Sequence, residues 1–257
     1  MADLKPSFCK ALFSGVILDD LVFPYPKMQT EEAENLKMII DTFNKFADDN
    51  IDSAKFDREA KIPKEVIEGL KELGFFGLNT AEEYGGFGLS STAFTKVLAA
   101  VSAHDGSLSL TLGAHQSIGI KALSLFGNEQ QKKKYYPKLV SGEMVGAFCL
   151  SEPGAGSDAA GIKTKAVWDD KNDCYILNGS KLWITNGGFA DFFTVFAKEE
   201  IEKDGEKTDK ITAFIVTADL PGISRGKEEE KMGQKERTLL PPPSSFLVHA
   251  RPAIDSK

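Results

Sequence analysis

Cysteine is scarce in this chain of 257 residues, and its few cysteines form no pattern. Cys9, Cys149 and Cys174 are an odd number at unrelated spacings, which gives neither a metal-ligand motif nor a disulfide framework. We therefore expect no metal site, and we expect reduced, mostly buried thiols in a reducing compartment.

Long apolar runs and an excess of basic residues are also missing. No apolar run approaches the roughly 20 residues that a bilayer-spanning helix requires. The N-terminus, with Asp3 early, lacks the apolar region of a signal peptide. The 31 Lys and Arg residues against 38 Asp and Glu give a net charge of −7. This balance argues against a nucleic-acid partner that depends on phosphate neutralisation.

The composition is otherwise globular, with 42% hydrophobic and 27% charged residues, and the length suggests about one to two domains. Up to about residue 145 the apolar residues recur with helical spacing. One stripe runs from Ala33 to Phe46 behind Thr30 as the expected N-cap. A second helix is expected to begin at Pro63 and to end at Gly74.

Asn128 followed by Gln131 resembles a capping box, which predicts a short helix leading to Pro137. The run Lys132-Lys133-Lys134 is expected to be the solvated face of this helix.

After residue 145 the segments shorten and favour β-branched and aromatic residues. We expect strands near 144–151, 163–168, 174–178, 181–185, 192–198 and 211–217. Asn178-Gly179 predicts a tight hairpin between two of them, Asp169 to Asp173 predicts a polar loop, and Asn186-Gly187-Gly188 predicts another turn. Successive short strands without helices between them indicate an antiparallel sheet or barrel. The predicted fold class is an N-terminal all-α helical domain followed by an antiparallel β-barrel domain.

The last stretch follows neither pattern. Residues 227–237 are mostly charged, and Pro241-Pro242-Pro243 fits neither a sheet ladder nor a helix interior. The short apolar piece Phe246-Leu247-Val248 is too isolated to assign. We expect this tail to be disordered.

A glycine-rich string after the first expected strand invites two interpretations. Gly154 to Ala159 fits the G-x-G-x-x-G/A dinucleotide fingerprint, but Pro153 precedes it and the strand near 163–168 leaves no room for the crossover helix. A flavin site fits better. Its ring needs a flat packing surface such as Trp183, and donors such as the Ser151 hydroxyl. The residues alone leave open a plain structural role, with Trp183 in the core and Ser151 in a turn.

Five segments in the same order closely resemble signature segments of the acyl-CoA dehydrogenase family. They are FCLSEPGAGSDAAGIKTK (148–165), LNGSKLWITNGG (177–188), GLNTAEEYGGFGLSS (77–91), LGAHQSIGIKALSLFGNEQQKKKYYPKLVSGE (112–143) and KITAFIVTADLPGIS (210–224). The resemblance covers roughly Ser7 to Gly233, and Phe23-Pro24-Tyr25-Pro26 resembles the very-long-chain branch.

The resemblance implies an FAD-dependent oxidation of a long-chain fatty acyl-CoA to the trans-2-enoyl-CoA in mitochondrial β-oxidation. A carboxylate removes the α proton while the β hydride passes to the flavin. It also implies electron-transfer flavoprotein as a partner and a place on the matrix side of the mitochondrial inner membrane. Family members are homodimers, but the domain that makes their dimer contacts has no match in this sequence.

By position, the resemblance implies cofactor-binding roles for Phe148, Leu150, Ser151, Gly156, Ser157, Trp183, Ile184 and Thr185. Phe148, Leu150 and Ser151 match residues at the pyrimidine edge of FAD. Ser157 matches a residue that also contacts the pantetheine arm of the substrate. Trp183 and Thr185 match residues that face the ring and its N5 atom.

Family members carry their catalytic glutamate on a C-terminal four-helix bundle, and nothing after Gly233 resembles that bundle. We therefore expect a helical domain over 29–145 behind an extension over 1–28, a middle β domain over 146–233 and an unrelated tail over 234–257. We name no catalytic residue, since Glu152 and His115 are expected to be structural. The chain is predicted to be a truncated dehydrogenase without its base, inactive alone. The alternative is a non-catalytic short isoform that acts through partner subunits or in respiratory complex assembly.

Overall fold

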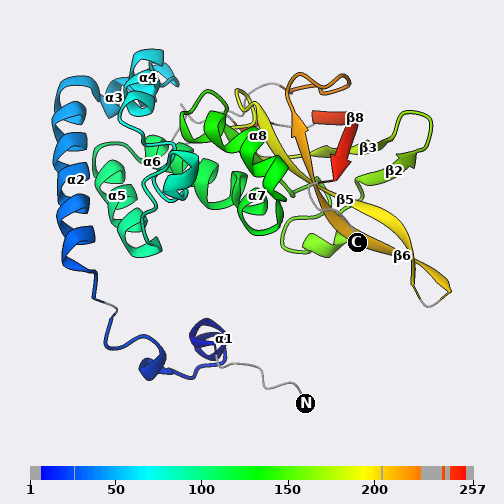
Figure 1. Cartoon of the computed structure of the whole chain (residues 1–257), viewed down its shortest axis with the longest axis horizontal. Coiled ribbons are helices and arrows are strands. Elements are labelled where there is room, and N and C mark those ends of the chain that lie inside the picture. Colours follow the sequence, from blue (N-terminus) through cyan, green and yellow to red (C-terminus); the bar gives the residue numbers. More distant parts are fainter. Residues whose placement is uncertain (1–6, 26, 204, 227–238, 241–243, 253–257) are drawn as a thin grey trace.

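The computed structural model describes residues 7–25, 27–203, 205–226, 239–240 and 244–252. A helical part and a curled sheet lie side by side, with helices α2–α6 (residues 30–113) at the left and the sheet at the right in Figure 1. This order confirms the predicted fold class. No helix among these residues is long and apolar enough to cross a membrane.

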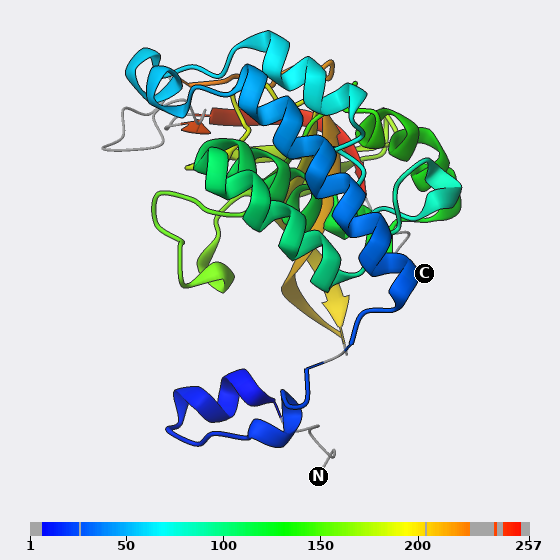
Figure 2. The ribbon, with the colours of Figure 1, turned by 90° about the vertical axis from the view of Figure 1, so that its left-hand side faces the viewer.

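The helical part is built from short elements around one apolar core. The helices are α1 (Phe8–Phe13), α2 (Thr30–Asn50), α3 (Ser53–Glu59), α4 (Lys64–Glu72), α5 (Ser91–His104), α6 (Gly106–Gly113), α7 (Lys121–Phe126) and α8 (Glu129–Val140), with 3-10 turns η1 (Asp19–Leu21) and η2 (Glu82–Tyr84) and a π-helical segment η3 (Ala114–Gly119). Phe43 of α2, Leu70 of α4 and Leu108 of α6 are fully buried in this core. Figure 2 shows α2 lying across the face of the other helices.

The helix ends follow the sequence signals closely. The Asn128–Gln131 capping box is present, and Gly74 has a φ of 75°, as a helix stop requires. Two details differ. Gln29 occupies the N-cap position of α2, and Thr30, the expected N-cap, is the first helical residue. Helix α8 also continues through the exposed Pro137 instead of ending there.

The first nineteen described residues form an arm that both views place away from the body of the molecule (Figures 1 and 2). Large apolar side chains remain exposed along it, including Phe13, Ile17 and Tyr25.

The sheet closes on itself. Its strands are β1 (Gly146–Cys149), β2 (Lys165–Asp169), β3 (Cys174–Lys181), β5 (Phe192–Lys203), β6 (Glu206–Thr217) and β8 (Ser244–Pro252), and β4 (Ile184–Thr185) pairs with β7 (Leu239–Leu240). The order is β1-β5-β2-β3-β8-β6, and β6 pairs back to β5. The barrel is not wholly antiparallel, because β5 runs parallel to both β1 and β2.

The predicted hairpin at Asn178-Gly179 is wrong, although the turns at 169–173 and 186–189 are present. Strand β3 runs straight through both residues, with Asn178 opposite Lys165 of β2. Glycine is needed at 179 for space, because a Cβ there would collide with the side chain of Thr164.

The expectation of a disordered tail is wrong for part of it. Strand β8 contains Phe246-Leu247-Val248 and pairs with β3 along Tyr175–Lys181 and with β6 at Phe214 and Ile215. The edge of β3 gains a partner there, which the apolar piece alone did not reveal. The residues 227–238, 241–243 and 253–257, including the triple proline, lie outside the described part.

The helices and the sheet meet at a buried polar junction. His115 of η3 accepts the N–H of Gly146 on β1 at Nδ1 (2.8 Å), so its Nε2 carries the proton and donates to the Leu139 carbonyl (3.1 Å). Thr194 of β5 donates to the carbonyl of Gly119 (2.7 Å). The bonds to Gly146 and Gly119 satisfy buried backbone groups at this junction.

His115 should make the fold less stable in acid. Burial lowers the pKa of His115 from 6.5 to about 4. Below pH 6.5 the unfolded chain therefore takes up a proton that the folded chain does not. By pH 4 this difference removes about 3 kcal/mol from the free energy of unfolding.

His115→Asn keeps an acceptor for Gly146 but does not titrate in this range. The variant should be less stable than the wild type at pH 7 and should lose less stability between pH 6.5 and pH 4. Urea unfolding across this range measures both. An equally steep loss in the two proteins would contradict a buried, neutral His115.

Candidate functional site

Two chain segments far apart in sequence lie side by side at one end of the sheet. The first follows β1 and contains Leu150 and Ser151, and the second is 182–185, which leads into and includes β4. The N–H of Leu182 donates to the carbonyl of Ser151 at 2.9 Å. The structure thus brings Ser151 next to the Trp183 segment, as the flavin interpretation requires.

Trp183 is an unusual residue in both exposure and backbone. Its side chain is 60% exposed, while its neighbours Leu182 and Ile184 are buried. Its φ is 57°, a left-handed conformation that costs a residue with a Cβ about 1–2 kcal/mol. Such strain persists only where the surroundings enforce it, and it gathers at functional sites. The structural alternative, with Trp183 in the core, is therefore wrong.

The glycine string forms an open turn. Glu152 and Ala155 exchange backbone hydrogen bonds of 3.0 Å, and a Cβ built on Gly154 or Gly156 would meet no atom within 4 Å. Ser157 beyond it is exposed. Only a three-residue 3-10 turn, Ala159–Gly161, follows before β2, so no helix is available to hold a pyrophosphate in the Rossmann manner.

The remaining predicted residues differ in what they can offer a ligand. Phe148 is half-buried, with its ring 4.9 Å from that of Phe196 between centroids. Leu150 and Thr185 are half-buried. Ile184 is 2% exposed and belongs to the core of the sheet, so only its backbone could face a cofactor.

A buried ion pair joins the two segments. Lys181 Nζ lies 2.8 Å from Glu152 Oε1 and 3.1 Å from the carbonyl oxygen of Leu150. The side chains are 0% and 6% exposed. The Glu152 carboxylate also accepts the N–H groups of Lys163 (2.6 Å) and Thr164 (3.0 Å) and the Thr164 hydroxyl. These bonds confirm the structural role expected for Glu152.

Burial and hydrogen bonding act in opposite directions on the pKa values of this pair. Burial acts to raise the pKa of Glu152, but the hydrogen bonds from Lys181, Thr164 and Lys163 outweigh it, and the net pKa is lowered. Burial lowers the pKa of Lys181, and the contact with Glu152 opposes that shift. A carboxylate held in this way has its lone pairs occupied and its proton affinity reduced, which makes Glu152 a poor general base.

Sequence reasoning missed Lys181 and Asn186. Asn186 Nδ2 donates to the Thr111 carbonyl of α6 (3.0 Å) and is 3.4 Å from the Gly146 carbonyl of β1. The two residues bracket the Trp183 segment, and both side chains are buried. The available signal was that Lys181 stands directly before the apolar Leu182-Trp183-Ile184. A lysine that is buried there needs a charged partner.

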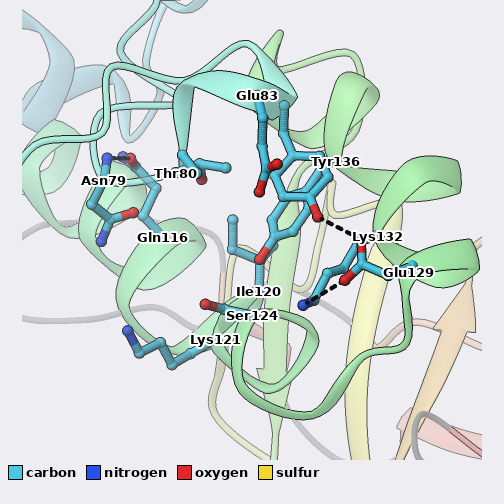
Figure 3. A pocket seen from close by; sticks show the side chains of 12 residues that line it. Asn79, Thr80, Glu83, Gln116, Ile120, Lys121, Ser124, Glu129, Lys132 and Tyr136 are labelled. Carbon is cyan, nitrogen blue, oxygen red and sulfur yellow. Dashed lines mark hydrogen bonds and ion pairs between the residues drawn. The ribbon is translucent and has the colours of Figure 1, made fainter.

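Two cavities of the helical part lie elsewhere. One, of about 300 Å³, lies between η2, η3, α7 and α8, and Figure 3 shows Glu129 and Lys132 facing each other at one side of it. Glu129 accepts hydrogen bonds from Tyr84 (3.1 Å) and Lys132 (3.2 Å). The other, of about 670 Å³, is mostly apolar and lies beside α2 and η2. No sequence-predicted site residue lines either one.

Two family models match this chain, one in the helical part and one in the sheet part. Residues 33–143 match the family model "Acyl-CoA dehydrogenase, N-terminal domain", and residues 147–240 match "Acyl-CoA dehydrogenase, middle domain". The second match extends beyond Gly233, where the sequence analysis ended the resemblance.

Individual proteins agree with this result. The mitochondrial very long-chain specific acyl-CoA dehydrogenase of Homo sapiens is 48% identical over 232 residues, which cover 89% of this chain and 35% of that protein. This chain thus spans about a third of the length of the curated relatives it matches. A chain of the electron transferring flavoprotein structure from Acidaminococcus fermentans superposes with a TM-score of 0.76 at 34% identity, covering 89% of this chain and 58% of that one. An acyl-CoA dehydrogenase complexed with FAD from Bacillus anthracis gives 0.70 at 37% identity, covering 92% and 38%.

The backbone strain at Trp183 can be measured with a glycine. Trp183→Gly relieves the positive φ and removes little buried surface, so the free energy of unfolding should change by less than about 1 kcal/mol. Trp168→Gly is the matched control, since Trp168 lies in β2, packs against Tyr175 and bonds Asp170. Trp168 is 43% exposed, so the lost contacts and the glycine in a strand should together cost about 1–3 kcal/mol. Chemical unfolding measures both, and equal losses would show that Trp183 serves packing.

Proposed function

The chain belongs to the acyl-CoA dehydrogenase family, and from this premise we propose that it carries the flavin-facing half of a site that oxidises long-chain fatty acyl-CoA. The single observation that carries the proposal is the exposed, strained Trp183 beside Ser151 at the end of β1. An aromatic ring held in this way serves a planar ligand better than it serves the fold.

The residues present fit FAD. Trp183 offers an indole face, and the open space at Gly154 and Gly156 lets a ligand approach the backbone. The hydroxyls of Ser151 and Thr185, with the backbone of 148–151, offer hydrogen bonds to the polar edge of a ring. The B. anthracis neighbour, which is an FAD complex, supports this assignment. When bound, FAD would supply the acceptor for the hydride that leaves the acyl chain.

The chain's own residues bind and orient more than they catalyse. In this proposal Ser157 contacts both the cofactor and the pantetheine arm of an acyl-CoA, and its exposure beyond the glycine turn supports that role. The carboxylate of Glu152 is occupied by Lys163, Thr164 and Lys181. It is therefore unsuited to take the α proton, and we assign no catalytic base to the described residues.

The proposed partners and compartment rest on the similarity to the relatives. The substrate is a long-chain acyl-CoA, and the electrons pass to an electron-transfer flavoprotein, in keeping with the A. fermentans neighbour. The matching very long-chain specific acyl-CoA dehydrogenases are named as mitochondrial, which supports a mitochondrial location. The matrix side of the inner membrane is part of the proposal and rests on the family resemblance alone. The homodimer expected from the family is not proposed for the described residues, because the family's dimer contacts lie in its C-terminal helical domain.

Titration with FAD tests the proposal. Binding should quench the fluorescence of free FAD and give a protein-bound visible spectrum after desalting. Trp183→Gly should weaken binding about tenfold, because the ring loses an aromatic contact worth about 1.4 kcal/mol. Trp168→Phe should bind as the wild type does. A wild-type chain that leaves FAD fluorescence unchanged would contradict the cofactor assignment.

Adding a long-chain acyl-CoA to the FAD-loaded chain tests the chemistry. Loss of the visible flavin absorbance without an added partner would contradict the alternative of a non-catalytic isoform. Binding of FAD without bleaching is the result expected from a chain whose nearby carboxylate is fully occupied.

A further inference from the structure

We propose that Glu152 and Lys181 are positioning residues that hold the two flavin-facing segments, 153–157 and 182–185, in place before any cofactor binds. The inference rests on the proposed function for the identity of the ligand, but the positioning itself concerns the free protein. Neither side chain is exposed enough to contact a ligand, with 6% and 0% of its surface accessible.

Glu152 bonds both ends of the loop that contains the glycine turn. Its backbone exchanges hydrogen bonds with Ala155, which shapes the turn. Its carboxylate crosses the loop to the N–H groups of Lys163 and Thr164, where the chain enters β2. The loop over 153–162 is therefore closed at its base by one side chain.

Lys181 fixes the other segment. It is the last residue of β3 and comes directly before the Trp183 segment. Its ammonium bonds the carbonyl of Leu150 at 3.1 Å, while the next residue, Leu182, bonds the carbonyl of Ser151 at 2.9 Å. Because Lys181 also pairs with Glu152, the turn and the Trp183 segment share a single buried anchor.

Stability alone does not account for such a pair. Removing two charges from water costs free energy that their attraction rarely exceeds, and well-packed apolar residues are often as stable. What charged hydrogen bonds add is direction, because the carboxylate and the ammonium bond specific backbone groups. A binding site that is already in its bound shape loses less entropy when the ligand arrives.

Three full-chain variants separate positioning from folding. Lys181→Met leaves Glu152 buried without its partner. Glu152→Gln combined with Lys181→Met removes both charges and guards against a single variant that fails to fold. Lys207→Met is the matched control, because Lys207 and Glu200 form an ion pair of 2.6 Å in the same domain with both side chains exposed.

Amide hydrogen exchange of the free protein is the first measurement. In Lys181→Met and in the double variant the amides of Ala155, Lys163, Thr164 and Leu182 should exchange at least tenfold faster than in the wild type. Those of the β5–β6 hairpin should keep their rates, as should all amides in Lys207→Met. A folded double variant that keeps these amides protected would overturn the proposal.

FAD titration is the second measurement and adds a spectroscopic signature. The double variant should melt within a few degrees of the wild type, bind FAD at least tenfold more weakly and give a less structured visible flavin band. Wild-type affinity and an unchanged spectrum in that variant would also overturn the proposal. If the wild type itself binds no FAD, the proposed function fails, and hydrogen exchange still decides the role of the pair.

Discussion

Four chain segments are joined by Glu152 and its partner Lys181, and the geometry of the β domain's exposed end depends on this pair. The end of β1, the start of β2 and the end of β3 all bond the Glu152 carboxylate or its lysine partner, and the glycine turn is closed by the backbone of Glu152. The carboxylate is nearly inaccessible to water, so each lost bond would leave a charged or polar group unsatisfied. Such a network is either complete or strongly unfavourable, which makes it a rigid base for a site.

The helical part also contacts the strand and the turn that lie next to this site. Asn186 reaches from the turn after β4 to the carbonyl of Thr111 on α6, and His115 of η3 holds the N–H of Gly146 at the start of β1. Beta1 therefore has a helical contact at its beginning and the Lys181 contact at its end. Contacts from the helical part and from the β domain both hold β1, so the position of the Trp183 segment depends on both parts.

Much of the fold could be predicted from sequence because its signals are local. The change from helical spacing to short β-branched segments, the capping box at Asn128 and the stop at Gly74 each depend on a few neighbouring residues. The hairpin at Asn178-Gly179 failed because the glycine serves a distant neighbour. It leaves room for Thr164, whose hydroxyl bonds Glu152. The pairing of β8 with β3 and the parallel pairs of β5 are equally long-range.

The same difference between local and long-range signals applies to the candidate site. Resemblance pointed to Ser151 and Trp183, which the structure brings side by side, but the ion pair beneath them is a tertiary feature that no local pattern predicts. Trp183 illustrates why. A left-handed backbone favours glycine, and exposure favours a polar residue, yet an indole occupies the position. Neither local propensity nor burial explains that choice. The buried residues on either side, Lys181 and Asn186, hold the segment against its own preference, and a rigid aromatic face aimed at solvent is what this arrangement supplies.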